Sequence, residues 1–306
     1  MTEFGGPDVL RVLELPVPAA GPGEIRIRVR AAGVNPVDVL VRRGQAFVSD
    51  AEPPYVPGMD AAGVVEEIGE GTETDLAVGD RVMAVAVVSG THGAYAEQLV
   101  VPAESVVRVP RAATDVEAAT LPMNGLTARM ALDLLDLPAG ATVAVTGAAG
   151  AVGGYAVQLA KADGLRVIAD AAPKDEQLVK DLGADVVLPR GTEFPRHVRT
   201  EVPAGVDGLV DTAGLTEATA AVRDGGRVAT SAGGFQESAG ERGIVTGRTF
   251  VPQYARDHAN LDRLRQLAEA GRITPRVART LPAERAAEAH RLLEAGGLRG
   301  RVVLTF

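Results

Sequence analysis

The chain has 306 residues, a formal net charge of −9 and no cysteine. This length suggests two domains, and the acidic balance excludes a free nucleic-acid-binding surface, which is usually basic. The absence of cysteine excludes a disulfide, a thiolate nucleophile and a Cys-ligated zinc site.

The first hundred residues are predicted to form a compact all-β unit. Residues 24–30 read EIRIRVR, with Ile and Val on one face and Arg on the other. Such strict alternation predicts a half-buried antiparallel strand. Further short strands, separated by Gly, Pro and Asp turns, are predicted at 61–69, 80–88 and 94–102.

The pattern changes after this unit. Thr114 and Glu117 match a capping box, and a helical stretch runs to about Leu137. Strands are then predicted at 142–146, 165–170, 184–188, 206–212, 226–232 and 249–252, with helices at 151–163, 174–182 and 215–223 and a polar loop after 184–188. This alternation predicts βαβ units and a parallel sheet.

The last fifty residues return to a mixed pattern. Asp257 is a suitable cap for a helix with Leu261 and Leu264 that ends at Gly271. A second helix is predicted at 283–295 and a terminal strand at 301–306. Periodicity alone leaves open whether this tail completes the β unit. The chain has no apolar run near the ~18 residues of a membrane span. Its start, MTEFGG, does not resemble a signal peptide, so we expect a cytoplasmic protein with no membrane partner.

A glycine cluster, VTGAAGAVGG, lies between a predicted strand and a predicted helix. Gly147, Gly150 and Gly153 form the pattern GxxGxxG, with Ala149 and Val152 in the same turn. Missing side chains let the backbone approach a diphosphate, and the helix start favours its negative charge. The cluster therefore predicts dinucleotide binding, although a tight glycine turn without a ligand is the alternative.

Asp170 ends the next predicted strand and bears on the choice of nucleotide. An acidic residue about 20 positions after such a turn typically binds the ribose 2′-OH and repels a 2′-phosphate. Lys174 would instead attract a 2′-phosphate. For each of the two residues, a solvated surface charge is the alternative interpretation. Taken together, the residues favour NADH because of Asp170.

Several stretches resemble the medium-chain dehydrogenase/reductase superfamily, specifically its zinc-free quinone oxidoreductase (zeta-crystallin-like) branch. They cover the chain almost from end to end: EFGGPDVL, AAGVNPVD, PYVPGMDAAGVVEEIGEG, VGDRV, GAYAEQLVVP, LPMNGLTARMAL, VTGAAGAVGGYAVQLAK, LGADVV and RGRVVLTF. The resemblance implies an α/β protein in which a Rossmann doubly wound parallel sheet is inserted in a GroES-like β-barrel catalytic domain. We place the catalytic domain at 1–112 and 256–306 and the dinucleotide-binding domain at 113–255.

The same resemblance implies a homodimer formed through the Rossmann sheet and NADPH as the hydride donor. NADPH conflicts with Asp170, because the family generally has a small neutral residue there. On the weight of the resemblance we place NADPH first, with NADH as the alternative. Members also typically begin with a short strand before TEFGGP that is absent here, so we expect an unpaired sheet edge and question whether Met1 is the true start.

Zinc-dependent relatives have a Cys where this chain has Asn35 and a His-Glu pair where it has Met59 and Asp60. An amide and a thioether are poor zinc ligands, so we expect no metal. Without a Lewis acid to stabilise an alkoxide, reduction of a conjugated acceptor is the easier chemistry. We expect Asp60 to be a structural hydrogen-bond acceptor.

Two residues are candidates for catalysis on the basis of the resemblance. Asn35 matches an Asn beside the nicotinamide, which could bind the carboxamide or the substrate carbonyl; a turn before Pro36 is the equally weighted alternative. Tyr55 matches a Tyr at the cleft and could donate to the nascent enolate, although a packing aromatic is the alternative. Enoyl-reductase relatives have a further Tyr where this chain has Gln45–Phe47, which argues against efficient enoyl-thioester reduction.

Further positions match family residues near the cofactor, each with a simpler reading as a turn or surface residue. They are Asn124, Thr127, Ser231, Gly233, Phe235 and Arg299.

The predicted function is reduction of a quinone or α,β-unsaturated carbonyl by NAD(P)H, with a small molecule as the only expected substrate. The alternative from another class is a non-catalytic NAD(P)H-binding sensor or structural protein of the same fold. A zinc alcohol dehydrogenase is a third reading and requires stoichiometric metal.

Overall fold

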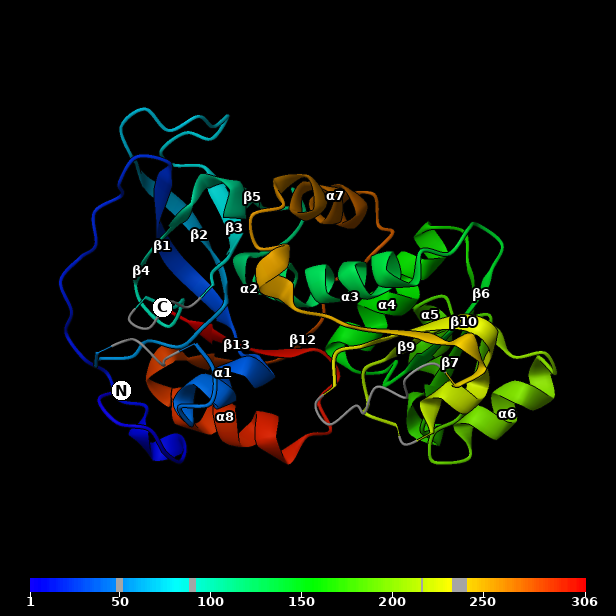
Figure 1. The fold of residues 1–306 in the computed structure, drawn as a ribbon. Coiled ribbons are helices and arrows are strands. Elements are labelled where there is room, and N and C mark those ends of the chain that lie inside the picture. Colours follow the sequence, from blue (N-terminus) through cyan, green and yellow to red (C-terminus); the bar gives the residue numbers. More distant parts are fainter. Residues whose placement is uncertain (48–51, 88–91, 216, 233–240) are drawn as a thin grey trace. The chain divides into compact units, whose positions relative to one another are not determined.

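The structure is a computed structural model that describes residues 1–47, 52–87, 92–215, 217–232 and 241–306 (Figure 1). The chain divides into two compact units. The first contains Met1–Met123, Pro252–Gly271 and Pro275–Phe306, and the second contains Asn124–Val251 and Arg272–Thr274. The domain boundaries after residues 112 and 255 stay a prediction, while packing changes from one unit to the other after Met123 and Val251.

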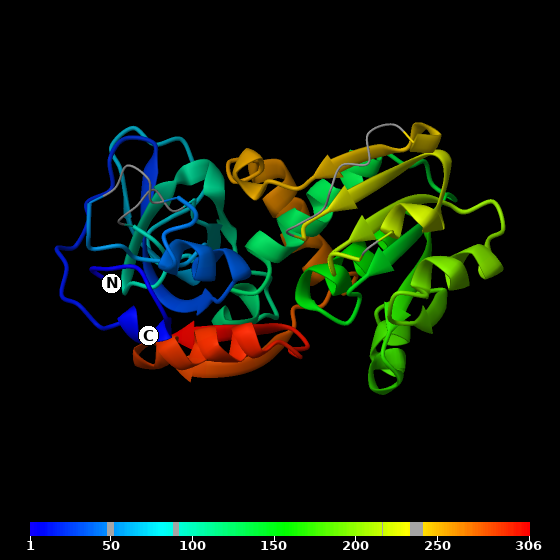
Figure 2. The same cartoon turned by 60° about the horizontal axis from the view of Figure 1, so that its bottom comes forward.

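The first unit contains a seven-stranded sheet in the order β12-β13-β1-β2-β3-β5, with β4 also paired to β1. Its strands are β1 (Glu24–Gly33), β2 (Asp60–Ile68), β3 (Arg81–Val85), β4 (Gln98–Pro102), β5 (Val106–Arg108), β12 (Val277–Pro282) and β13 (Arg301–Thr305). Its helices are α1 (Pro36–Arg42), α2 (Asp115–Ala118), α7 (His258–Glu269) and α8 (Ala286–Ala295). The tail therefore returns to the β unit, and Figure 2 shows the red helix α8 beside the C-terminal strand, which it contacts.

Strand β1 is the centre of this sheet. It pairs antiparallel with β2 along its length, with β4 through Glu24–Arg28 and with β13 through Ala31–Gly33. Ile25 and Ile27 are fully buried, as the alternation predicted. Their burial contributes roughly 1.5–3 kcal/mol per side chain to folding.

The second unit contains a six-stranded sheet in the order β11-β10-β9-β6-β7-β8, in which every pair is parallel. Its strands are β6 (Thr142–Thr146), β7 (Arg166–Ala171), β8 (Val186–Pro189), β9 (Val206–Asp211), β10 (Val222–Thr230) and β11 (Val245–Arg248). Its helices are α3 (Pro122–Leu135, whose first two residues belong to the first unit), α4 (Ala151–Ala162), α5 (Glu176–Asp181) and α6 (Phe194–Glu201). In chain order this is the 3-2-1-4-5-6 arrangement of a doubly wound dinucleotide fold, with its switch point between β6 and β9. The predicted fold class is confirmed.

The parallel sheet is covered on both faces. Phe194 and Val198 of α6 pack with Ala144 of β6 and Leu209 of β9 on one face. Val143, of opposite parity in β6, is also fully buried. Burial on both faces explains why these strands read as unbroken apolar runs.

Four local predictions need correction. Helix α6 occupies part of the predicted polar loop; its buried Phe194 and Val198 have the i, i+4 spacing of one helix face. The helix predicted at 215–223 is a short 3-10 turn, Ala218–Ala221, because β10 begins at Val222. The strand predicted at 249–252 lies earlier, as β11.

The fourth correction concerns the helical stretch predicted from the Thr114 capping box to about Leu137. The box itself is confirmed, because Thr114 Oγ1 accepts the Glu117 N–H at 3.2 Å. However, α2 ends at Ala118 and α3 begins at Pro122. Proline at the first helical position explains the break, since it disfavours a helical conformation in the residue before it.

No helix among the described residues is long and apolar enough to cross a membrane.

Candidate active site

Asn35 is the N-cap residue of α1, two residues after the end of β1, and its side chain is buried. Its backbone N–H donates to Asp38 Oδ2 at 2.7 Å, so the third helical residue closes the start of the helix. Its side-chain Nδ2 donates to Asp60 Oδ2, also at 2.7 Å. Asn35 is therefore held at its backbone by one carboxylate and at its side chain by another.

Asp60 is the first residue of β2 and is completely buried. Its second oxygen, Oδ1, accepts the Met123 N–H at 2.7 Å. Burial raises the pKa of Asp60 to about 7, against the opposing effect of these hydrogen bonds and of the Arg301 charge. The prediction that Asp60 accepts structural hydrogen bonds is confirmed.

Asp38 is the second fully buried carboxylate and joins three donors. Oδ2 accepts the Asn35 N–H and the Tyr95 hydroxyl, the latter at 3.2 Å, and Oδ1 accepts the Gly58 N–H at 3.1 Å. Burial raises the pKa of Asp38 to about 6. Because Gly58 follows the Tyr55 loop, Asp38 ties that loop to the start of α1.

A hydrogen-bonded chain continues from Asp38 away from Asn35. Tyr95 Oη lies 3.1 Å from His290 Nε2, and His290 Nδ1 lies 3.2 Å from Arg42 Nη1. A guanidinium only donates, so Nδ1 accepts and Nε2 carries the proton that is donated to Tyr95. Burial and the Arg42 charge lower the pKa of His290 to about 4, which is consistent with a neutral ring.

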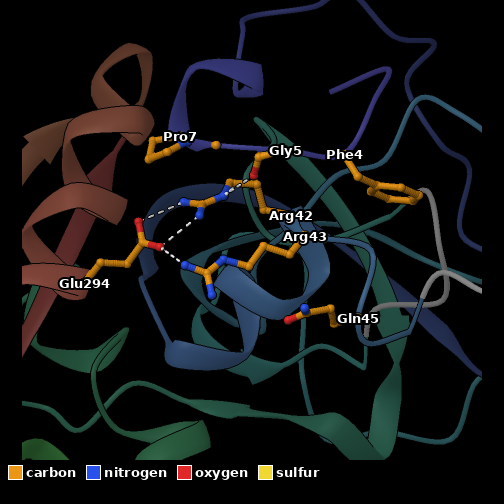
Figure 3. Close-up of a pocket in the computed structure, with 8 residues that line it drawn as sticks. Phe4, Gly5, Pro7, Arg42, Arg43, Gln45 and Glu294 are labelled. Carbon is orange, nitrogen blue, oxygen red and sulfur yellow. Dashed lines mark hydrogen bonds and ion pairs between the residues drawn. The ribbon is translucent and has the colours of Figure 1, made fainter.

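Arg42, at the far end of this series of hydrogen bonds, lines a cavity of about 380 Å³ at the C-terminal end of α1 (Figure 3). Arg42 donates to Glu294 Oε1 at 2.9 Å, and Arg43 donates to the same oxygen at 2.6 Å. Arg42 Nε also donates to the Gly5 carbonyl oxygen at 3.0 Å. The guanidinium of Arg42 is thus committed to internal partners, and this cavity lies at the opposite end of α1 from Asn35.

Tyr55 has the surroundings of a packing aromatic. Its ring stacks on Phe4, with centroids 4.5 Å apart and planes inclined by 26°. It is buried in a small apolar cluster with Met1 and Val41. Its assignment as a proton donor stays a prediction.

The glycine cluster of the second unit forms the turn between β6 and α4. Gly147 has φ +66°, a conformation that favours glycine. A Cβ at Gly153 would lie 2.7 Å from the Gly147 carbonyl carbon, so α4 approaches the turn as closely as backbone allows. Gly150, the N-cap, has no side chain to accept the first-turn amides, which leaves the helix start suited to a diphosphate.

Threonine and aspartate side chains join the strand ends beside this turn. Thr146 Oγ1 donates to Asp211 Oδ1 at 2.5 Å, and Thr212 Oγ1 donates to the Thr146 carbonyl oxygen at 2.7 Å. Thr230 Oγ1 donates to the Asp211 carbonyl oxygen at 3.1 Å. The carboxyl ends of β6, β9 and β10 are therefore fixed relative to each other at the switch point, where such folds bind ligands.

Asp170 lies at the end of β7 with its side chain directed to the glycine turn. Its Oδ1 accepts the Ala148 N–H at 3.0 Å, and burial raises its pKa. Arg190, which follows β8 and is exposed, lies 3.9 Å from its Oδ2. Lys174 is also exposed, in the short turn after β7. The Asp170 carboxylate is thus engaged with the turn and has one exposed cation, Arg190, beside it.

The other candidates divide between the units. Asn124 and Thr127 are buried in α3, and Ser231 follows β10, with its N–H donating to the Asp211 carbonyl oxygen at 3.1 Å. Arg299 belongs to the first unit and donates to the Leu298 carbonyl oxygen at 3.2 Å. Gly233 and Phe235 lie outside the described residues.

Sequence reasoning did not single out Asp38, Tyr95, His290 or Arg190. Tyr95 and His290 lie 195 residues apart in the chain, and no local spacing connects them. Arg190 follows a predicted strand end, a position that could have been considered for a phosphate contact.

Two family models match the chain. Residues 21–111 match the alcohol dehydrogenase GroES-like domain, and residues 182–304 match the zinc-binding dehydrogenase family.

Known proteins match over larger parts of the chain. It is 36% identical over 221 residues to the synaptic vesicle membrane protein VAT-1 homolog of Homo sapiens, a match covering 70% of this chain and 54% of that protein. It is 30% identical over 314 residues to the NADPH-dependent alkenal/one oxidoreductase, chloroplastic, of Arabidopsis thaliana, covering 99% and 78%. It is 29% identical over 318 residues to the quinone oxidoreductase of Sus scrofa, covering 99% and 95%. The chain thus spans about half the length of the first relative and most of the other two.

Solved structures agree over nearly the whole chain. An NAD-dependent alcohol dehydrogenase superposes with a TM-score of 0.90 at 33% identity, covering 100% of this chain and 98% of that one. A mycobacterial protein complexed with NADPH gives a TM-score of 0.87 at 32% identity, with the same coverage.

Proposed function

The chain belongs to the quinone oxidoreductase branch of the medium-chain dehydrogenase/reductase superfamily, and on this basis we propose that it transfers hydride from NADPH to a quinone or an α,β-unsaturated carbonyl compound. The observation that carries the proposal is the glycine turn at the switch point of the parallel sheet, bounded by Gly147 and Gly153. Such a turn accepts a diphosphate over the start of α4.

Asp170, Arg190 and Lys174 support NADPH over NADH. The Asp170 carboxylate is buried against the Ala148 N–H, whereas Arg190 and Lys174 are exposed cations at the ends of neighbouring strands. A 2′-phosphate needs cations and is repelled by a free carboxylate. Arg190 would neutralise Asp170 as well as contact a phosphate, so NADH stays the second cofactor in this proposal.

Bound NADPH would supply a hydride to the distal carbon of the acceptor or to the quinone ring, and the acceptor gains a proton to complete the reduction. The chain's own contribution is to hold the reactants in place and to offer polar groups. Asn35 would bind the carboxamide or the substrate oxygen, and Tyr55 or water would supply the proton. Asn35 and Met59 provide no zinc ligand set, so the proposal requires no metal.

A panel of quinones and enones with NADPH and NADH tests this function. We expect acceptor-dependent loss of the absorbance of the reduced nicotinamide, with a higher kcat/KM for NADPH. The purified protein should contain no stoichiometric zinc by elemental analysis. Saturable nucleotide binding without acceptor-dependent oxidation would support the non-catalytic alternative, and stoichiometric zinc would support an alcohol dehydrogenase.

Tyr55→Phe tests the proton donor. If the hydroxyl donates in the transition state, kcat falls by about 100-fold while the Kd for NADPH changes little, as measured by steady-state kinetics and fluorescence titration. Phe4→Leu is the control, because it removes the stacked partner of the Tyr55 ring and keeps the hydroxyl. An unchanged kcat in Tyr55→Phe would remove Tyr55 from the mechanism.

A further inference from the structure

Asp211 is the last residue of β9, which lies between β6 and β10 in the parallel sheet (Figure 1). Its side chain is completely buried. One carboxylate oxygen, Oδ1, accepts the Thr146 hydroxyl at 2.5 Å and lies 3.1–3.3 Å from three backbone N–H groups of the next loop. These N–H groups belong to Ala213, Gly214 and Leu215, and the last also lies 3.2 Å from Oδ2. A single buried carboxylate thus joins the end of β6 to three consecutive N–H groups that follow β9.

The loop that Asp211 holds, residues 212–215, lies against the glycine turn. The Thr212 N–H donates to Thr146 Oγ1 at 3.2 Å, and Thr212 Oγ1 donates to the Thr146 carbonyl oxygen at 2.7 Å. A Cβ at Gly147 would collide with Thr212 Oγ1 and would lie 3.5 Å from the Thr212 carbonyl carbon. The 212–215 loop therefore fills the space beside the first glycine of the turn.

We propose that Asp211 is a positioning residue for the nucleotide. By holding the 212–215 loop against Gly147, it keeps the glycine turn in the conformation that receives the diphosphate. Both carboxylate oxygens already accept hydrogen bonds from the protein, so Asp211 acts through Thr146 and the loop. The inference rests on the proposed function for the diphosphate, whereas every contact that it uses lies within the second unit.

The exposure of the loop decides what the loss of this carboxylate does. Ala213 and Gly214 are exposed, so water can replace the carboxylate at their N–H groups. The main-chain carbonyl of Asp211 still accepts Thr230 Oγ1 after any substitution, so the end of β10 keeps its contact. The loop is therefore loosened, and Gly147, whose φ is +66°, loses the neighbour that restrains it. A nucleotide then has to order the loop as it binds, and ordering a segment on binding lowers affinity.

Fluorescence titration of Asp211→Ala and Asp211→Asn with NADPH tests the proposal. We expect Asp211→Ala to raise the Kd at least ~10-fold. Asp211→Asn should recover most of the affinity, because its amide oxygen can take the place of Oδ1, which faces all four donors. A wild-type Kd in Asp211→Ala, or an equal loss in both variants, would overturn the proposal.

Asp207→Ala is the matched control at the other end of the same two strands. Asp207 Oδ2 accepts the N–H of Thr142, the first residue of β6, at 2.8 Å, and its Oδ1 accepts Arg223 Nε at 2.7 Å. This variant weakens the contact between β6 and β9 away from the glycine turn, so it should lower the urea midpoint and leave the Kd for NADPH unchanged. A loss of affinity equal to that of Asp211→Ala would show a general effect of destabilisation and contradict positioning.

Two substitutions at Thr146 give a second, milder test that leaves Asp211 in place. Thr146→Val keeps the shape of the side chain and removes the hydroxyl that contacts Asp211 and the Thr212 N–H. Thr146→Ser keeps the hydroxyl and removes the methyl group. The serine variant should bind NADPH several-fold more tightly than the valine variant, and equal Kd values would contradict the proposal even if Asp211→Ala fails to fold.

Kinetics separate this inference from the proposed function. In Asp211→Ala the KM for NADPH should rise while kcat at saturating NADPH stays within ~2-fold of the wild type, as expected for a loss of binding alone. If NADPH binds and no acceptor is reduced, the proposed function fails, and the titrations still decide the role of Asp211. An enzyme that reduces acceptors with an unchanged KM for NADPH in Asp211→Ala would overturn the inference and leave the function intact.

Discussion

Replacement of Gly153 with alanine is expected to abolish tight nucleotide binding, raising the Kd for NADPH at least ~10-fold, or about 1.4 kcal/mol. A Cβ at this position would lie 2.7 Å from the Gly147 carbonyl carbon and 2.9 Å from the Ala148 Cα. Both are backbone atoms, so α4 has to move away from the turn. Its first backbone N–H groups are then displaced from the positions in which they would bind the diphosphate. Fluorescence titration with NADPH measures the effect.

Two other glycines provide the controls. A Cβ at Gly150 would meet only the Gly147 carbonyl oxygen, at 3.0 Å, so Gly150→Ala should fold normally and bind NADPH more weakly by filling the space over the helix start. A Cβ at Gly6 meets no atom within 4 Å, and Gly6→Ala should match the wild type. Wild-type affinity in both Gly150→Ala and Gly153→Ala would exclude this turn as the diphosphate site.

Asp38→Ala is expected to lower the free energy of unfolding by about 3–5 kcal/mol, because it leaves a buried polar network without its acceptor. The Asn35 N–H, the Gly58 N–H and the Tyr95 hydroxyl all donate to this carboxylate. Urea unfolding followed by circular dichroism measures the loss. Tyr95→Phe removes one donor to Asp38 and the acceptor of the His290 Nε2–H but leaves the Asp38 carboxylate in place, so it should cost less, about 1–3 kcal/mol.

The loss in Asp38→Ala should also depend on pH. Burial raises the pKa of Asp38 to about 6 in the folded protein, above its ordinary value of 3.8. The folded state therefore binds this proton more tightly than the unfolded state, and the contribution of Asp38 to stability declines as pH rises from about 4 through 6. The difference between wild type and Asp38→Ala should be larger at pH 5 than at pH 8; a difference that grows with pH would contradict a raised pKa.

The elements that sequence predicted well are those whose signal is local. The alternation of EIRIRVR led to β1, and the apolar run TVAVT with its glycines led to β6 and α4. Helix α6 was missed because its buried apolar residues, Phe194, Pro195 and Val198, are followed and separated by polar residues. The helix expected at 215–223 fails because Val222 pairs with Val206 of β9, a tertiary contact that overrides local propensity.

The candidate site divides in the same way. The glycine turn could be placed from its spacing, and Asn35 from its resemblance to family members. The directions of the side chains could not be predicted from the sequence. The Asp170 carboxylate accepts the Ala148 N–H, and the Tyr55 ring packs on Phe4. The buried hydrogen bonds from Asp38 through Tyr95 to His290 join residues 57 and then 195 positions apart, so only the tertiary fold brings them together.

The pairing of β1 with β13 constrains how the protein is made on the ribosome. Ala31 pairs with Thr305, so the central strand of the first sheet cannot complete its pairing until β13 has been synthesised. The parallel sheet of the second unit ends at Arg248 and is available earlier. Since domains generally fold as units during synthesis, the nascent chain is expected to acquire its parallel-sheet unit first, and β1 completes its pairing only after β13 has emerged.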